Sequence, residues 1–395
     1  TLLFVLKSIY LFIKLIHCNT YNQQVRTIMF EFTPTPRVKR SPFYDATVRD
    51  GVKSFYPYNN MFLPTGYGDP EKEYWRLING VSMWDVGVQR QVELFGKDAC
   101  KLAQILSPRD LSNLEIGQSK YVALCDHRGV IINDPILSKL EENKFWFSIA
   151  DSKVLFWARA IAYERNLNVN IIEPDVSPMA VQGPKAVDVI SSVFGEWVRD
   201  LKYFYFKETS LNGIPLLLVR SGWSKQGGYE LYLMDGSKGD ELWDIIKEAG
   251  KPWDIGPGYP NTVERIESGL LSWGGDTDDN TNPYEVRLGK YVDLDVPEDV
   301  IGLSALKKIN QEGPKRHQLG IVLDTEEKFK SLGVWYDIFV NNEKLGDMTC
   351  GIWSNRIKKN IGLCLVSVKL KSGEKVKVNK NGIEYTGTMT ELPFI

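Results

Sequence analysis

The sequence predicts an α+β protein that folds into two or three domains. The chain has 395 residues, which is more than one ordinary domain contains. Helical and strand-like segments alternate without a regular β-α-β repeat, and the segment after about Gln318 is rich in strands. In addition, 43% of the residues are hydrophobic and 25% are charged, which is typical of a globular chain rather than a disordered one.

The first half of the body alternates helices with strands. Helices are predicted at 71–79, 97–106 and 152–165, and strands at 120–125, 130–133 and 144–150. Within 97–106 the apolar residues recur at i, i+3, i+4 and i+7, which places them on one face of a helix. Gly129 closes the turn at 126–129 and supplies the positive φ that a hairpin needs.

A similar pattern restarts after Ile172. Helices are predicted at 184–194, at 241–249 and from 261 to the glycine pair 274–275, and strands at 180–182, 216–221 and 228–234. Pro184 suits the first turn of its helix because it lacks an amide proton. Asn261 and Glu264 have the spacing of a capping box, so they predict a helix start.

The tail of the chain is predicted to be a separate small β domain. Asn341-Asn342 and Asn381-Gly382 are turn signals between strand-like runs. The linker that precedes this domain is expected at 312–316, a polar stretch with Gly and Pro.

The N-terminus departs from the composition of the body. Residues 1–16 form an apolar run interrupted by Lys7 and Lys14, and this run is short and charged for a bilayer span. It also lacks the basic start and cleavage site of a signal peptide. Because a methionine stands at Met29, we expect residues 1–28 to lie upstream of the natural start or to be a non-native leader. The alternative is an uncleaved membrane anchor.

The net charge and the cysteines indicate which partners and which cellular compartment to expect. There are 48 Lys and Arg against 50 Asp and Glu, for a net charge of -2, so nucleic acid is not expected as a partner. The five cysteines are widely spaced, and no glycosylation sequon is present. Together these features indicate a reduced, cytoplasmic protein.

Common cofactor and catalytic motifs are absent from the sequence. Three scattered histidines argue against a catalytic zinc site. The sequence contains no G-x-G-x-x-G fingerprint, no P-loop, no H-E-x-x-H motif and no G-x-S-x-G elbow. We therefore expect no metal, flavin or nicotinamide cofactor.

Two acidic residues stand at unusual places in predicted strands. Asp134 ends a strand just before Pro135, where a carboxylate can be directed at a ligand amine. On the residues alone, a simple Asn-Asp-Pro turn is the favoured alternative. Glu230 and Tyr232 share one strand face by the period of two, and such an acid can bind the N–H pair of a heterocycle. The alternative is a solvated strand face.

Two further candidates are Trp223 and Arg265. Trp223 lies in a glycine-rich hairpin loop and can form a stacking or cation–π surface, or else close the loop over the core. The guanidinium of Arg265 can bind a ligand carboxylate through two hydrogen bonds. The alternative is an ion pair within its own helix, where Glu264 and Glu267 are near.

These positions and their surroundings resemble the folate-dependent aminomethyltransferase family, that of the glycine cleavage T-protein. The matching stretches cover most of residues 41–395. They are SMWDV at 82–86, IGQSKYVALCDHRGVIINDPIL at 116–137, VQGPKA at 181–186, RSGWSKQGGYELYL at 220–233, ERIESGLLSWGGDTDDNTNPYEV at 264–286, IGLSALKK at 301–308 and GDMTCGIWSNRIKKNIGLCLV at 346–366.

The resemblance implies a three-domain cloverleaf with a β-barrel-like C-terminal domain and a central channel for tetrahydrofolate. Its implied domains are 41–88 plus 179–283, 89–174 plus 284–311, and 316–395.

The resemblance also implies roles for individual residues. Asp134 matches the acidic residue beside the pterin N5 nitrogen and takes the catalytic role. Glu230 matches the glutamate that bonds the pterin, and Arg265 matches an arginine of the folate site. Tyr121 and Trp223 match positions that line the channel.

Departures from the T-protein pattern affect the donor side. Tyr56-Pro57-Tyr58-Asn59-Asn60-Met61 replaces the usual G-W-x-M-P stretch, and 223–226 reads W-S-K-Q where T-proteins have Y-T-G-E. Within the family the pattern looks most like the dimethylsulfoniopropionate demethylases. That likeness implies transfer of a methyl group from a small sulfonium to N5 of tetrahydrofolate. The alternatives are a T-protein that uses a lipoyl carrier and a non-catalytic folate-binding protein.

A sulfonium donor favours aromatic contacts, because its positive charge disappears in the transition state. The candidates are Tyr56, Tyr58, Trp223 and Tyr232, with Tyr232 also beside the folate, and Lys53 is a guess for the substrate carboxylate. The expected partners are the sulfonium and tetrahydrofolate, with no stable membrane association. A homodimer is left open.

Overall fold

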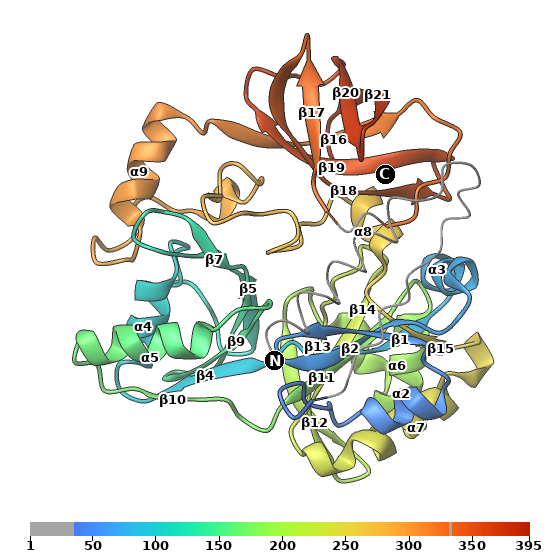
Figure 1. Cartoon of the computed structure of the whole chain (residues 1–395). Coiled ribbons are helices and arrows are strands. Elements are labelled where there is room, and N and C mark those ends of the chain that lie inside the picture. The colour runs from blue at the N-terminus through green and yellow to red at the C-terminus, as the bar shows by residue number, and fades with distance from the viewer. Residues whose placement is uncertain (1–34, 332–333) are drawn as a thin grey trace, which may run out of the picture. The chain divides into compact units, whose positions relative to one another are not determined.

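The computed structural model describes residues 35–331 and 334–395. The predicted leader, residues 1–28, lies outside them. Residues 38–395 form one unit, which contains three large sheets and the helices that cover them (Figure 1). No helix among the described residues is both long enough and apolar enough to cross a bilayer.

The six-stranded sheet has the strand order β12-β13-β14-β11-β3-β15. Its strands are β3 (Ser82–Asp85), β11 (Ser177–Gln182), β12 (Phe206–Leu211), β13 (Ile214–Val219), β14 (Gly228–Leu233) and β15 (Gly256–Gly258). The associated helices are α2 (Tyr44–Arg49), α3 (Pro70–Asn79), α6 (Ala186–Phe194) and α7 (Gly239–Ala249). Helix α8 (Thr262–Glu267) packs against the C-terminal barrel instead. Side chains from α2, α6 and α7 share one core with this sheet, which includes Phe43, Ile190 and Trp243.

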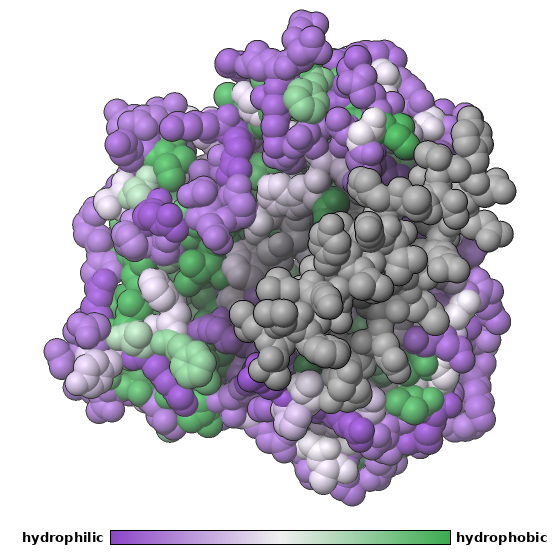
Figure 2. All heavy atoms as spheres, in the orientation of Figure 1, coloured by the Kyte–Doolittle hydropathy of each residue, from purple (hydrophilic) through white to green (hydrophobic). Residues whose placement is uncertain are grey.

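The five-stranded sheet has the order β10-β4-β9-β8-β5. Its strands are β4 (Gln91–Phe95), β5 (Gln118–Tyr121), β8 (Ile136–Glu141), β9 (Lys144–Ser148) and β10 (Asn170–Ile172). The helices α4 (Ala99–Leu106) and α5 (Val154–Glu164) supply buried residues to its core. Figure 2 shows hydrophobic residues gathered on the side of the molecule where Figure 1 places these two helices.

Two small hairpins accompany the large sheets. They are β1 (Ser54–Tyr58) with β2 (Met61–Gly66), and β6 (Leu124–Cys125) with β7 (Ile131–Asn133). Gly129 has a φ of 77°, as the predicted turn requires. The single strand predicted at 120–125 is wrong, because Val122 and Ala123 separate β5 from β6 and the two pieces join different sheets.

The C-terminal residues form a closed barrel with the order β16-β19-β18-β17-β20-β21. Its strands are β16 (Arg316–Leu323), β17 (Tyr336–Val340), β18 (Glu343–Ser354), β19 (Lys359–Ser367), β20 (Lys375–Lys380) and β21 (Ile383–Thr390). Asn341, Asn342 and Asn381 have positive φ values of 48°, 65° and 54°, which confirms both predicted turns. Helix α9 (Leu303–Glu312) ends just before the barrel, so Arg316 belongs to β16 and not to the linker.

Helix α8 begins where the sequence predicts and ends early. The Asn261 Oδ1 atom accepts the amide protons of Val263 and Glu264, at 3.0 and 3.2 Å. The predicted end at the glycine pair 274–275 is wrong, because α8 stops at Glu267 and the chain turns at Gly269, which has a φ of 61°.

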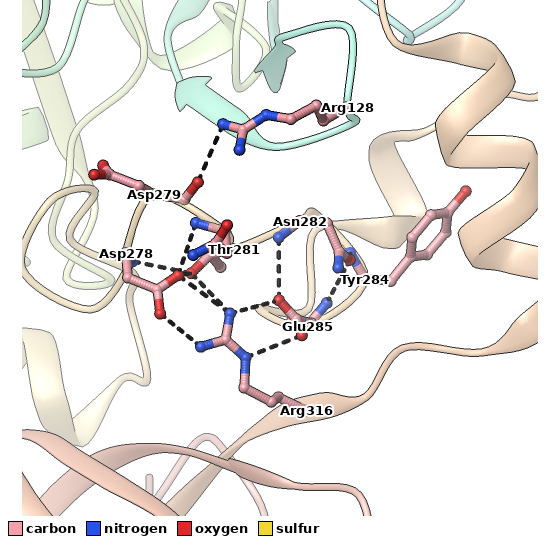
Figure 3. Close-up of polar contacts among 9 residues, drawn as sticks. Arg128, Asp278, Asp279, Thr281, Asn282, Tyr284, Glu285 and Arg316 are labelled. Carbon is pink, nitrogen blue, oxygen red and sulfur yellow. Dashed lines mark hydrogen bonds and ion pairs between the residues drawn. The ribbon is translucent and has the colours of Figure 1, made fainter.

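The connecting segment 270–285 contains no helix or strand, and it contacts the barrel and the β6–β7 hairpin. Arg316 of the barrel donates to Asp278 at 2.6 Å and to Glu285 at 3.0 Å (Figure 3). The Ile131 amide donates to the Thr281 carbonyl at 2.9 Å, which ties the segment to the β6–β7 hairpin. The domain boundaries given above remain a prediction.

Candidate active site

Asp134 lies between β7 and β8, and its side chain is partly buried. Its Oδ2 atom accepts a hydrogen bond from the Tyr121 hydroxyl at 2.7 Å. Burial raises the pKa of the Asp134 carboxyl to about 7, and the Tyr121 hydrogen bond opposes that rise. The residue therefore stands in the two-residue connection between β7 and β8, where the structure has no turn, and it carries a carboxyl that can exchange a proton near neutral pH.

The β1–β2 hairpin places Tyr58 near enough to Asp134 for the charge of that carboxyl to act on it. Asn59 and Asn60 have φ values of 49° and 59°, as a tight turn of two left-handed residues requires. The Asn59 Nδ2 atom donates to the carbonyls of Val88 and Ala150, at 3.0 and 3.2 Å. Burial and the charge of Asp134 raise the pKa of Tyr58.

Asn133, the residue before Asp134, binds the same carbonyl. Its Nδ2 atom donates to the Ala150 oxygen at 3.0 Å, and its Oδ1 atom accepts the Ala150 amide at 3.0 Å. The backbone of Ala150, just after β9, thus fixes the residues next to Tyr58 and Asp134.

Glu230 lies on β14 opposite Val219 and Ala180 of the neighbouring strands. Its side chain is only 6% exposed, so the solvated-face alternative is wrong. The Ser221 hydroxyl donates to the Glu230 Oε2 atom, and burial raises the pKa of the carboxyl. The predicted alternation is confirmed, because Tyr229 and Leu231 pack into the core on the other side of the sheet.

A group of tyrosines lies beside Asp134. The ring of Tyr121 meets the ring of Tyr291 edge-on, with centroids 5.1 Å apart. The charges of Glu230 and Tyr291 both add to the effect of burial in raising the pKa of Tyr203. Tyr121 and Tyr291 therefore form an aromatic group beside Asp134, and Tyr203, which is 62% exposed, lies near enough to Glu230 and Tyr291 for their charges to act on it.

Sequence reasoning missed Tyr203, Tyr291 and Arg109. The Arg109 guanidinium lies 4.9 Å from the centroid of the Tyr291 ring, and its Nη1 atom donates to the Tyr121 carbonyl at 2.6 Å. Only Tyr203 carries a signal in the sequence, since it opens the aromatic run 203–206. Tyr291 and Arg109 stand in unremarkable local contexts.

Arg265 forms a buried ion pair. Its Nη1 atom lies 2.6 Å from the Asp276 Oδ2 atom and donates to the Leu270 carbonyl at 2.9 Å. The alternative of an ion pair with Glu264 or Glu267 of its own helix is therefore wrong. Its contact with folate remains a prediction.

Tyr232 packs between the six-stranded sheet and the five-stranded sheet. It is buried, and its ring stacks on that of Trp146 with centroids 6.4 Å apart. Burial and the charge of Glu230 raise the pKa of Tyr232, and the nearby Ser148 side chain opposes that rise. Of the predicted aromatic contacts, it is the most deeply enclosed by protein.

The other predicted residues differ in exposure. Trp223 is partly buried in the β13–β14 loop, residues 220–227. Tyr56 is 57% exposed on β1, and its charge acts on Tyr58. Lys53 is exposed and makes no ion pair with the described residues. No described contact relates Lys53 to Asp134.

A polar surface pocket of about 350 Å³ lies elsewhere on the molecule. Arg90 and Glu173 line it, and they form an ion pair with each other. None of the predicted site residues lines this pocket, so it is not the candidate active site. In the part of the chain that the structure describes, no His, Cys, Asp and Glu side chains gather into a metal site.

Two family models match the chain over most of its length. The GCVT N-terminal domain matches residues 43–296, and the glycine cleavage T-protein C-terminal barrel domain matches residues 316–395.

Curated relatives fall into two groups. The dimethylsulfoniopropionate demethylase DmdA of Ruegeria pomeroyi is 42% identical over 298 residues, which is 75% of this chain and 81% of the relative. An aminomethyltransferase of Caldanaerobacter subterraneus is 28% identical over 354 residues, which is 86% of this chain and 91% of the relative.

A solved structure shows the same fold. The crystal structure of the glycine cleavage system aminomethyltransferase T from Bartonella henselae matches with a TM-score of 0.79 at 23% identity. The match covers 90% of this chain and 98% of that one. Together with the closed barrel, it confirms the predicted α+β fold of the aminomethyltransferase type.

Proposed function

The chain belongs to the glycine cleavage T-protein family of aminomethyltransferases, and we propose that it is a tetrahydrofolate-dependent dimethylsulfoniopropionate demethylase. It transfers a methyl group from the sulfonium to N5 of tetrahydrofolate. The products are 5-methyltetrahydrofolate and 3-(methylthio)propionate. The observation that carries this assignment is the 42% identity to a demethylase, against 28% to an aminomethyltransferase.

The residues around the aromatic group suit a reduced pterin. Glu230 is a buried carboxyl whose acceptor oxygens can pair with adjacent N–H donors of a heterocycle. Tyr121 and Tyr291, which lie beside Asp134, offer flat apolar surfaces for a ring. The ion pair between Arg265 and Asp276 sets the position of the guanidinium that we assign to the folate site.

Asp134 is the group that we assign to proton transfer. Tetrahydrofolate supplies the nucleophilic amine N5, which takes the methyl group and gives up a proton. With its pKa raised to about 7, the Asp134 carboxyl can accept a proton near neutral pH and release it again. The Tyr121 hydroxyl donates to that carboxyl and fixes its direction.

The sulfonium side needs positioning rather than acid catalysis. The thioether leaves as a neutral group, so no proton donor is required. Aromatic faces bind the cation moderately and release the neutral product, and we assign this role to Tyr56, Tyr58 and Trp223. Tyr232 supports this group from the core, and Lys53 is our candidate for the substrate carboxylate.

A direct experiment separates this function from its alternatives. Purified protein is incubated with tetrahydrofolate and dimethylsulfoniopropionate, and 5-methyltetrahydrofolate is measured by mass spectrometry. A parallel reaction contains an aminomethyl-lipoyl carrier protein as donor. Methyl transfer from the sulfonium supports the proposal. Turnover of the carrier alone would assign the protein to the glycine cleavage reaction, and tight folate binding without any turnover would indicate a folate-binding protein.

We also propose that the protein is cytoplasmic, that it does not bind nucleic acid and that it does not associate stably with membranes. The net charge of -2 and the free thiols of Cys100, Cys125, Cys350 and Cys364 support this proposal. A homodimer is a further proposal, which size-exclusion chromatography with light scattering tests directly.

A further inference from the structure

The first half of the β13–β14 loop is held by the six-stranded sheet. The Ser221 hydroxyl donates to Glu230, and the Gln182 Nε2 atom donates to the Ser221 carbonyl at 3.2 Å. The Ser224 hydroxyl donates to the Gln182 Oε1 atom at 2.8 Å. Trp223 lies between these two anchored serines, so its backbone is fixed from the side of β14.

The second half of the loop is held by one residue of α8. The Lys225 amide and the Gln226 side chain both donate to the Glu264 Oε1 atom, at 3.1 and 3.2 Å. The Ser268 hydroxyl donates to the same oxygen at 2.7 Å. Glu264 is fully buried, and its Oε2 atom has no partner among the described residues.

This use of Glu264 departs from what its position in the helix predicts. A glutamate three residues after a helix cap usually reaches back to the amide of the capping residue. Here Asn261 caps the helix by its own side chain, and Glu264 points its bonded oxygen at the loop instead. Burying a carboxylate costs free energy unless it is hydrogen-bonded, and two of the three hydrogen bonds that Glu264 accepts come from the β13–β14 loop.

We propose that Glu264 is a positioning residue. It fixes the β13–β14 loop, which carries Trp223, and thereby sets the affinity of the protein for the sulfonium. The proposal rests on the function assigned above. Glu264 immediately precedes Arg265, so the same helix turn supports the donor side through the loop and the folate side through the arginine. Nothing else in the described structure bonds to the Lys225 amide.

The test compares Glu264→Ala with Glu264→Gln in the full chain. Glutamine keeps an acceptor for the Lys225 amide, whereas alanine removes it. We expect Glu264→Ala to speed amide hydrogen exchange of the loop at least tenfold and to raise KM for dimethylsulfoniopropionate at least tenfold. KM for tetrahydrofolate should change less than twofold, and Glu264→Gln should restore most of both effects.

Glu267→Ala is the matched control. Glu267 is fully buried on the same helix, but it accepts bonds from Tyr74, Ser354 and Arg356 rather than from the loop. This variant should lower the melting temperature while loop exchange stays at the wild-type rate. A loss of loop protection in both variants would mean that the effect is general destabilisation, and it would overturn the proposal.

Two other results would also overturn the proposal. One is unchanged loop exchange in Glu264→Ala, and the other is an equal rise of KM for both substrates. Hydrogen exchange needs no turnover, so it tests the positioning role even if the wild-type protein fails to demethylate the sulfonium. That failure would instead overturn the proposed function.

Discussion

Asp134 shows how a single residue acquires reactivity from its surroundings. An exposed aspartate is fully ionised at neutral pH and is a weak base. Desolvation between β7 and β8 raises the pKa of this carboxyl to about 7, while Tyr121 keeps it oriented. The residue can therefore take up a proton and lose it within the physiological range.

Replacing Asp134 with Asn should mainly affect turnover. Asparagine keeps the shape and can still accept from Tyr121, but it cannot take up a proton. We expect kcat to fall by about 10²-fold, the lower end of the effect of a general base, with KM for both substrates within about threefold. Initial-rate kinetics at saturating substrate measure this change. Full turnover of the variant would refute the role of Asp134.

The raised pKa of Asp134 predicts that activity and stability change in opposite directions with pH. Activity of the wild-type protein should rise with pH through about 7, because only the ionised form accepts a proton. Stability should fall over a similar interval. The folded-state pKa is raised from 3.8, so the free energy of unfolding decreases as pH rises from about 4 to about 7. Both dependences should be reduced in Asp134→Asn, as pH-rate profiles and urea titrations can show.

Trp223 is the aromatic contact that we expect to matter most for the donor. Trp223→Ala removes a cation–π face, so KM for dimethylsulfoniopropionate should rise by about tenfold, as expected for a desolvated contact. KM for tetrahydrofolate should stay within twofold. The two constants are measured by varying each substrate in turn, and an equal rise in both would count against the aromatic contact.

At the scale of an element, the β1–β2 hairpin is fixed in position by one buried side chain. At the tip of the hairpin, Asn59 donates hydrogen bonds to the carbonyls of Val88 and Ala150. Since Asn133 binds the same Ala150 carbonyl, the positions of Tyr58 and Asp134 are linked by hydrogen bonds instead of by direct contact.

Asn59→Gly should release this hairpin. Glycine tolerates the positive φ of residue 59, so only the side-chain bonds are lost. We expect the free energy of unfolding to fall by about 2 kcal/mol, because buried carbonyls lose their donor. KM for the sulfonium should rise as Tyr58 moves.

Asn60→Gly is the control, since residue 60 has the same backbone conformation but is exposed. Its effect should stay within about 0.5 kcal/mol. Equal losses in the two variants, measured by urea unfolding, would contradict the role of the Asn59 side chain.

At the scale of the whole molecule, the connecting segment 270–285 joins the barrel to the β6–β7 hairpin. Arg316 places its guanidinium between Asp278 and Glu285, and Arg128 donates to the Asp279 carbonyl from the β6–β7 hairpin (Figure 3). The hydrogen bond from Arg316 lowers the pKa of Asp278 to about 2, and the Thr281 hydroxyl contributes in the same direction.

Arg316→Ala should destabilise the protein. It leaves two carboxylates facing each other, and Glu285 is only 4% exposed. We expect a loss of about 2 kcal/mol, below the 3–5 kcal/mol of fully buried pairs, because solvent reaches Asp278. Arg128→Ala, at the exposed side of the same segment, should lose less than about 1 kcal/mol. Thermal unfolding of both variants makes the comparison, and a larger loss for Arg128→Ala would contradict this account.

The sequence by itself determined the local features of this protein. Helical spacing located α4, the Asn261 cap located the start of α8, and asparagine turns located two barrel hairpins. The period of two placed Glu230 on its correct face. Each of these features depends on residues within a few positions of one another, where backbone geometry alone decides the outcome.

Only the tertiary structure decided how the site is assembled. The partner of Arg265 is Asp276 rather than a neighbour on its helix, and Glu264 bonds to Lys225, 39 residues away in sequence. Tyr291 reaches the site from a segment without any motif. Such contacts depend on which surfaces of the sheets pack together, and that choice is made by burial of the whole core and not by local propensity.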